Sequence, residues 1–425
     1  MKTAFANARL VDPATGSDAP GDLLVEDGRI LDSGQNLAQG LSGGTTVIDC
    51  GGHVLAPGLV DFNATIGEPG ARHRESFKSA GQAAAAGGVT TIVTQPDTDP
   101  PIDDPAVLEF VRRRAREVCA VRVLPKATLT KGAQGTTMTE YRFLLDAGAV
   151  AFSDGERAVA DPVVFRRCLE YAASVDALVC HFPQEPHFSA LGCATEGLFA
   201  TLRGLAGVPA EAEAIMLTRD IRIAALTGAR YHASCISTAE SLGILRRARE
   251  SGLDVTASVA VPHLAMNELD IADFRTFSKV SPPLRHEDDR AAMEEALSEG
   301  LIDAIVSAHR PWDEESKRLP FAQASAGGVG LETMLAVSLD LHHRGGIPLP
   351  VLFERLSTAP ARLAGLEAGT LAKGSLADLV LFDPGAPWRI DRKALHSKSK
   401  NSPFHDRLVQ GKVLGTWVEG RRVFG

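Results

Sequence analysis

The sequence contains few cysteines, no excess of basic charge and no long apolar segment. The six cysteines form no C-x-x-C pair, so we expect neither a zinc knuckle nor a dithiol redox motif. The 44 Lys and Arg against 53 Asp and Glu give a net charge of −9, which argues against nucleic-acid binding. No apolar run approaches the roughly 18 residues of a membrane-spanning helix. The N-terminus has no signal-peptide pattern and the cysteines are unpatterned, so we expect a cytoplasmic location.

The central part of the sequence alternates between β-type and helix-type segments. The chain has 425 residues, 44% hydrophobic and 23% charged, as is typical of a folded globular protein. Regular alternation predicts parallel strands covered by helices. With residues 58–65 as the first, about nine strand candidates are present, and a closed barrel needs eight. The other candidates are residues 90–96, 121–129, 149–154, 177–182, 230–237, 254–263, 276–283 and 303–311, and the clearest helix-type segments are residues 105–118, 162–175, 237–252 and 286–300.

Both ends of the chain have a β-rich composition. Residues 1–55 and residues 366–425 contain short runs of β-branched and leucine residues separated by Gly, Asp and Pro. Neither end alone is long enough for a stable sandwich, so we expect the two ends to pair. The sequence therefore predicts an α/β protein. A TIM-type (β/α)8 barrel would span residues 56–365, and a small β-sandwich domain would combine residues 1–55 and 366–425. In such barrels the chemistry lies at the carboxyl ends of the strands.

Short motifs in a fixed order extend over nearly the whole chain. The first are Pro57-Gly58-Leu59-Val60-Asp61, Glu68-Pro69-Gly70 and residues 87–91; the later ones are Ala151-Phe152-Ser153-Asp154, Arg219-Asp220-Ile221, Tyr231-His232, Ser237-Thr238, residues 281–285, residues 330–333, residues 374–379 and the tail at residues 396–404. With these motifs the sequence resembles the cyclic amidohydrolases, and the dihydroorotases in particular.

The resemblance implies a definite chemistry for the site. Opening a cyclic amide at neutral pH needs an activated water, and a bound metal lowers the pKa of water from about 15.7 to about 7. A nearby carboxylate then transfers protons. Family members that work this way carry His-x-His after the aspartate of the first strand. They also carry a bridging Lys or Asp, two more histidines at strand ends and a late Asp near the eighth strand.

Three of these positions carry residues that cannot perform this chemistry. Asn63 and Thr65 stand where the two first-strand histidines are expected, so the first metal would lose two ligands. Ala308 stands where an aspartate is expected before His309, and a methyl group can neither coordinate a metal nor move a proton. The three changes lie at the ends of two strands far apart in the sequence but remove one chemical function.

The positions expected to contact substrate have changed as well. Gly67 replaces an arginine, so no guanidinium is available there to bind a carboxylate. Asp97 replaces an asparagine and places negative charge toward an anionic substrate. Ser281 also replaces an asparagine, and Pro262 and Trp312 stand where histidines are expected.

Three residues with metal-ligating side chains remain. The resemblance places Asp154, His181 and His232 at the bridging and second-metal positions. Three protein ligands are the usual set of a catalytic zinc. Two interpretations stay open: these residues bind a single zinc, or they are polar residues held at strand ends by hydrogen bonds. We expect no cofactor, with one zinc as the alternative.

The sequence therefore predicts a dihydroorotase homologue that has kept its scaffold and lost its reaction. Bacterial relatives of this kind assemble with aspartate transcarbamoylase, so the resemblance implies that enzyme as a partner in a homo- or hetero-oligomer. The alternative is an active cyclic amidohydrolase with one zinc, acting on dihydroorotate, a hydantoin or allantoin. In that case Asp97 would favour a neutral or cationic substrate. A third hypothesis is an unrelated binding role for the pocket.

Overall fold

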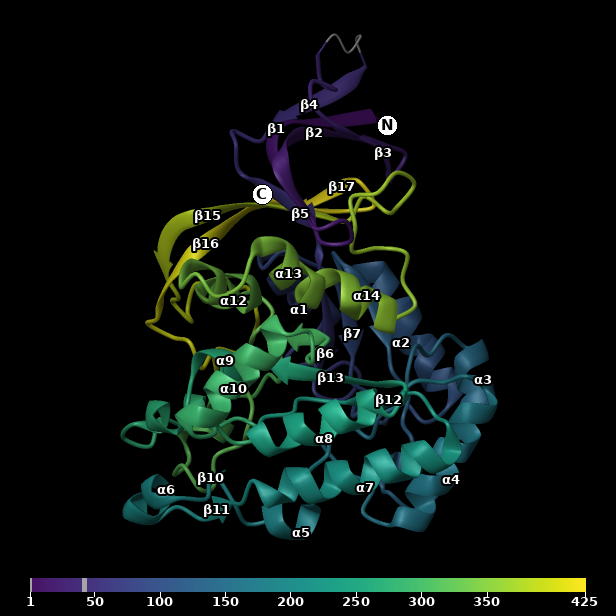
Figure 1. Ribbon diagram of the computed structural model, residues 1–425, viewed down its shortest axis with the longest axis vertical. Helices are drawn as coiled ribbons and strands as arrows, with labels where there is room; N and C mark the ends of the chain where they lie inside the picture. The colour runs from purple at the N-terminus through teal and green to yellow at the C-terminus, as the bar shows by residue number, and fades with distance from the viewer. Residues whose placement is uncertain (1, 40–43) are drawn as a thin grey trace.

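The computed structural model describes residues 2–39 and 44–425, arranged as a barrel with a small β domain at one end (Figure 1). Met1 and residues 40–43, which belong to the predicted N-terminal β segment, lie outside the described residues. Both ends of the chain run into the β domain, where purple and yellow strands lie together at the top of Figure 1. The barrel and its helices fill the lower part of the view.

The β domain is a sheet in which the two ends of the chain pair. Its order is β17-β16-β15-β5-β1-β2-β3, and β4 also pairs with β1. The two ends meet where β15 runs antiparallel to β5, with Leu381 opposite Leu55. Phe5 and Trp417 make an edge-to-face contact in its core, with ring centroids 4.9 Å apart. The strands are β1 Lys2–Asp12, β2 Ser17–Glu26, β3 Arg29–Gly34, β4 Thr45–Asp49, β5 Val54–Pro57, β15 Leu379–Arg389, β16 Leu408–Val418 and β17 Arg421–Phe424.

The barrel consists of parallel strands in sequence order. Two parallel sheets, β6-β7-β8 and β9-β12-β13-β14, form most of its wall. Phe152 bridges Ala127 on one side and Val179 on the other, and the Ala64–His309 bridge closes the ring. The strands are β6 Leu59–Ala64, β7 Val89–Thr94, β8 Arg122–Pro125, β9 Val179–His181, β12 Tyr231–Ala233, β13 Val255–Ala260 and β14 Ala304–Val306.

Two predicted strands differ from the structure. The predicted strand at residues 276–283 is wrong: Thr276–Ser278 is a short 3-10 helix, and no strand follows it. Pro282 and Pro283 lack the backbone N–H that a central strand needs, so this segment cannot join the ladder. The fourth barrel strand, expected over residues 149–154, is reduced to the bridge at Phe152.

All four helices that the sequence pattern singles out are present. Asp104 and Asp161 cap α2 and α4, each followed by a proline in the first helical position, where no N–H is needed. The long helix α7 lies outside those four segments. The helices around the barrel are α1 Phe77–Ala86, α2 Pro105–Val118, α3 Tyr141–Asp146, α4 Pro162–Ser174, α7 Glu211–Thr227, α8 Ala239–Glu250, α10 Glu287–Ser298 and α12 Met334–His343.

Shorter elements complete the chain. Between β9 and α7 an insertion contains two short strands and two short helices, drawn at the bottom of Figure 1. Across residues 2–39 and 44–425, no helix combines the length and apolar character needed to cross a bilayer. The remaining elements are α5 Pro186–Ser189, β10 Ala194–Thr195, α6 Leu198–Arg203, β11 Gly207–Val208, α9 Val261–Ala265, α11 Glu314–Arg318, α13 Leu349–Phe353, α14 Ala359–Leu363, 3-10 helices at Lys131–Ala133 and Glu268–Ile271, and a π-helical turn at Glu354–Thr358.

Candidate active site

The ends of the barrel strands bring the altered positions together at one mouth. Asn63, at the end of β6, accepts a hydrogen bond from Gln95 Nε2 at 2.5 Å. Its own amide donates to Cys235 Sγ, 3.0 Å away, in the turn after β12. Burial raises the pKa of the Cys235 thiol to about 12, so the thiol is protonated at neutral pH. Asn63, which stands where a metal-binding histidine is expected, therefore belongs to a chain of neutral hydrogen-bonding groups from Gln95 to Cys235.

Arg310 spans the mouth and binds the residues around it. Its guanidinium lies 3.0 Å from Asp97 Oδ2 and 3.4 Å from Glu156 Oε1. It also donates to Thr65 Oγ1 at 3.3 Å. These contacts join the loops after β6, β7 and Phe152 through one side chain. The negative charge that Asp97 introduces is thus compensated from within the chain.

The charges in this cluster perturb one another. Burial raises the pKa of Glu156, and Arg310 works against that shift. Burial opposes ionisation of Arg310, but Glu156 and Asp97 raise its pKa above the usual value, so it stays a cation at all accessible pH. The resemblance places an arginine and an asparagine here that bind an anionic substrate. This chain instead has Arg310, which is paired with two carboxylates of its own.

Ala308 faces a space too small for a substrate. It has φ of 48°, in the left-handed region of backbone conformation. The cavity beside Ala308 has a volume of about 10 Å³ and is also lined by Glu156, Ser281 and Phe404. That is roughly the room of one water molecule. A larger cavity of about 390 Å³ shares Ser281 and Glu156 with it and is also lined by Gln184 and Lys279.

Gly67 lies where a side chain does not fit. A Cβ atom built on it would lie 2.3 Å from the carbonyl oxygen of Ala71 and 3.1 Å from that of Glu75. These are backbone atoms, so the loop itself would have to move. The loop after β6 has closed over the position at which the resemblance places a substrate-binding arginine.

Gly67→Ala is therefore expected to lower the free energy of unfolding by about 1–3 kcal/mol, as overpacking does. The measurement is urea unfolding followed by circular dichroism. Gly243→Ala in α8 is the matched control, because a Cβ there meets only Arg247 Nη1 at 3.5 Å. The control should be neutral or stabilise the fold by about 0.5–1 kcal/mol. Equal stability of the two variants would contradict the closed-loop interpretation.

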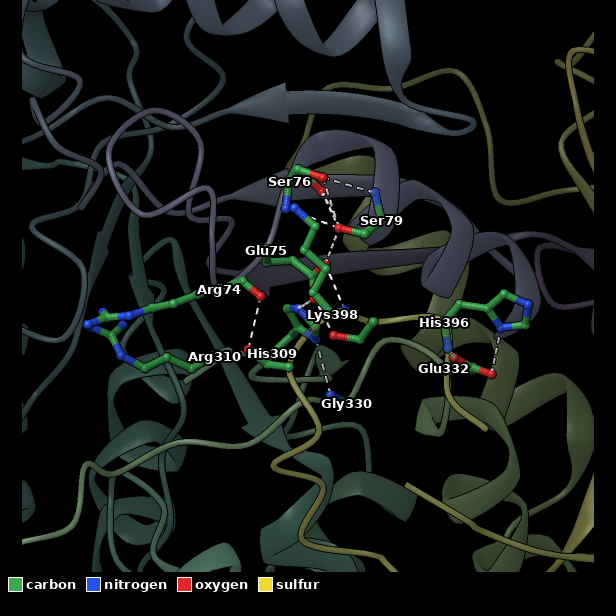
Figure 2. A network of polar contacts seen from close by, with 12 residues as sticks. Arg74, Glu75, Ser76, Ser79, His309, Arg310, Gly330, Glu332, His396 and Lys398 are labelled. Carbon is green, nitrogen blue, oxygen red and sulfur yellow. Dashed lines mark hydrogen bonds and ion pairs between the residues drawn. The ribbon is translucent and has the colours of Figure 1, made fainter. Parts of the chain in front are cut away.

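His309 connects the mouth to the C-terminal tail (Figure 2). It accepts a hydrogen bond from Gly330 N at 3.2 Å, and its Nε2 lies 3.7 Å from Glu75 Oε2. Glu75 also accepts a hydrogen bond from Ser397 of the tail. Burial opposes ionisation of Glu75, but His309 and the serine hydroxyls hold its pKa below the usual value. His309 therefore ties the tail to the barrel.

Asp154 and His181 are already bonded within the protein. Thr130 donates to Asp154 through its backbone N–H at 3.0 Å and through its hydroxyl at 2.5 Å. His181 Nδ1 lies 2.6 Å from Asp220 Oδ2, and its Nε2 accepts the N–H of Val159 at 2.9 Å. Both ring nitrogens of His181 are thereby engaged.

His232 lies on the other side of the strands. In the β9–β12 register Ala233 is opposite His181, and His232 is opposite Cys180. Side chains alternate along a strand, so His181 and His232 point to opposite faces. His181 packs on Phe165 of α4, whereas His232 contacts Phe62 inside the barrel and hydrogen-bonds with Ser258 at 3.0 Å. Burial lowers the pKa of His232 to about 3, so it is neutral.

The predicted zinc ligands therefore do not fit a metal. Within residues 2–39 and 44–425, no three or more His, Cys, Asp or Glu side chains are grouped so that they could hold one. The hydrogen-bonding interpretation of Asp154, His181 and His232 agrees with their contacts. The structure does not bring these three residues together as ligands of one metal, because the two histidines point to opposite faces of their strands.

Several residues of the mouth were missed by sequence reasoning. Cys235, rather than His232, reaches the position beside Asn63. The signal was its place two residues beyond β12, where a strand-end side chain can reach the mouth. Arg310 and Glu156 carried no such signal, because they meet Asp97 only through barrel closure.

Comparison with known proteins identifies the family. A family described as "Dihydro-orotase-like" matches residues 52–241. The dihydroorotase of Anaplasma phagocytophilum (strain HZ) is 40% identical over 99% of this chain and 95% of its own length. The chain belongs to the dihydroorotase family. The dihydroorotase of Syntrophus aciditrophicus (strain SB) is 37% identical and covers 100% of this chain and 99% of its own length.

Solved structures confirm the predicted fold class for this dihydroorotase family member. The L-hydantoinase of Arthrobacter aurescens has a TM-score of 0.89 at 25% identity, covering 99% of this chain and 95% of its own. The dihydropyrimidinase of Brevibacillus agri has a TM-score of 0.85 at 24% identity, with the same coverage of both chains. The fold is the amidohydrolase TIM barrel with a β-sandwich domain.

Proposed function

We propose that this chain is a non-catalytic dihydroorotase homologue of pyrimidine biosynthesis that acts as a structural partner of aspartate transcarbamoylase. The observation that carries the loss of catalysis is the Arg310–Asp97–Glu156 cluster across the mouth. The cluster occupies the region in which the family's substrate and activated water would meet. Asn63, Thr65 and Ala308 supply neither a metal ligand nor a proton carrier.

The alternative, an active single-zinc amidohydrolase, has less support. It needs Asp154, His181 and His232 to share one ion. His181 would have to release the N–H of Val159, and His232 would have to cross to the other face of the sheet. The names of the relatives favour dihydroorotase chemistry in the family as a whole, so an assay must decide for this chain.

The purified protein is expected to show no ring opening of dihydroorotate, with or without added zinc, and to contain zinc well below one atom per chain. An active dihydroorotase in the same assay serves as the positive control. Turnover that a chelator abolishes and zinc restores would overturn the proposal. Hydantoin and allantoin belong in the same assay, because the single-zinc alternative predicts activity on one of them.

The partner role rests on the family resemblance, and we expect an oligomer with aspartate transcarbamoylase. The two proteins from one organism should co-migrate on size exclusion at micromolar concentration, and the transcarbamoylase should lose activity without this chain. Separate elution together with a fully active transcarbamoylase would rule out the structural role. The cytoplasmic location stays a prediction, and fractionation of the cells that make this protein would test it.

A further inference from the structure

A further cavity lies beside the C-terminal tail. Its volume is about 280 Å³. Its walls come from the short helix at Thr276–Ser278, the segment after Arg310, the tail, and His73 in the loop after β6. Its principal lining residues are Phe277, Trp312, Arg392, Lys393, Lys398 and Lys400. None of these residues has a role in the proposed function.

The cations of this cavity have no carboxylate partners. In the described parts of the chain, no Asp or Glu oxygen lies within 4.0 Å of the charged groups of Arg392, Lys393, Lys398 or Lys400. The two acidic residues in the lining are engaged elsewhere: Asp313 pairs with Arg74 at 3.1 Å, and Glu314 with Arg318 at 3.0 Å. The lining therefore contains more cationic groups than carboxylates, in a protein whose net charge is −9.

Some of these cations are held in place by backbone carbonyls. Lys398 Nζ donates to Arg72 O at 3.0 Å, and Lys400 Nζ donates to Ser397 O at 2.7 Å. The guanidinium carbon of Arg392 lies 4.9 Å from the centre of the Phe277 ring. Fixed like charges repel one another, and an anion that binds between them removes that cost. A guanidinium with nearby ammonium groups is the donor set that binds phosphate.

The size and the aromatic walls restrict the ligand further. A volume of about 280 Å³ is just below the range of roughly 300–1,000 Å³ that is typical of small-molecule sites. Trp312 donates its indole N–H to Ala326 O, and Arg74 covers its ring at 4.2 Å, so the indole is fixed in orientation. We propose that this cavity binds a small organic phosphate, of about the size of a nucleoside monophosphate, with its phosphate on the tail cations and its apolar part against Trp312 and Phe277.

Calorimetry on the full chain at low salt tests the proposal. The probes are uridine 5′-monophosphate, uridine and inorganic phosphate. We expect the monophosphate to bind at one site per chain and uridine to bind at least about tenfold more weakly, since charge-assisted hydrogen bonds are lost. Inorganic phosphate should bind more weakly than the monophosphate. Equal affinity for monophosphate and uridine, or for monophosphate and inorganic phosphate, would overturn the proposed organic phosphate.

Variants locate the site. Arg392→Gln with Lys393→Gln should weaken monophosphate binding about tenfold or more. Arg113→Gln with Arg222→Gln removes the same charge from exposed positions on α2 and α7 and should leave the affinity unchanged. Equal losses in both double variants would show a non-specific charge effect and overturn the assignment. Lys398→Gln repeats the test at a separate position if the first double variant does not fold.

Tryptophan fluorescence gives an independent readout. Of the three tryptophans, Trp312 is the one that lines this cavity. Monophosphate should change the emission of the native chain, and Trp312→Phe should abolish that change. An unchanged ligand response in Trp312→Phe would place the binding site elsewhere and overturn the proposal. Because this readout involves no turnover, it does not depend on whether the mouth is catalytic.

Discussion

Replacing Arg310 with methionine is expected to destabilise the protein by about 2–3 kcal/mol at neutral pH. Breaking a fully buried ion pair costs about 3–5 kcal/mol. The expected loss is smaller here because the cluster is partly solvated. The side chains of Arg310, Asp97 and Glu156 are 21%, 19% and 35% exposed. Without the guanidinium, two carboxylates would face each other at the mouth. The measurement is urea unfolding, with the midpoint and slope both recorded.

The pH dependence of this effect has a definite sign. Burial already raises the pKa of Glu156 in the folded state, and loss of Arg310 raises it further. A carboxyl group with a raised folded pKa stabilises the fold at low pH, and that stability is lost as the pH rises through the folded pKa. The deficit of Arg310→Met relative to wild type should therefore be larger at pH ~8 than at pH ~5.

A double variant provides the control. Asp97→Asn removes one of the two opposed carboxylates, so Asp97→Asn with Arg310→Met should recover part of the lost stability. The recovery measures the coupling between the two residues. A pH-independent loss, or no recovery in the double variant, would mean that Arg310 acts through packing rather than charge.

Replacing Glu213 with alanine is expected to produce the largest loss of stability, about 3–5 kcal/mol. Glu213 lies on α7 and is fully buried. Its carboxylate accepts hydrogen bonds from both the backbone and the hydroxyl groups of Ser237 and Thr238, and from Ser241 Oγ at 2.6 Å. Arg285 lies 3.8 Å away. Removing the carboxylate takes the nearest anion away from the buried Arg285 and leaves several buried donors without their acceptor.

The change should also reach the mouth. Ser237 and Thr238 lie two and three residues beyond Cys235, so Glu213 fixes the turn that places Cys235 beside Asn63. Glu240→Ala, on the exposed first turn of α8, is the matched control and should change stability by less than about 0.5 kcal/mol. Thermal and urea unfolding of both variants checks the prediction. A mild effect for Glu213→Ala would mean that water replaces the carboxylate.

The fold could be predicted because its signals are local. Alternation of apolar runs with amphipathic stretches predicted the barrel and the four helices at residues 105–118, 162–175, 237–252 and 286–300. The segment at residues 276–283 was predicted wrongly because β-type residues outweighed two prolines that prevent strand pairing. The site was predictable only as far as single positions: Asn63, Thr65, Asp97 and Ala308 do lie at the mouth.

What the sequence alone determined is which chemical groups are present and which are missing from the strand ends. It could not determine the partners of those groups, because each partner comes from a distant part of the chain. Arg310 meets Asp97, and Asn63 meets Cys235, only when the barrel closes. His181 and His232 looked like ligands of one ion until the strand register placed them on opposite faces. Side-chain direction depends on register and closure, and these are properties of the whole fold.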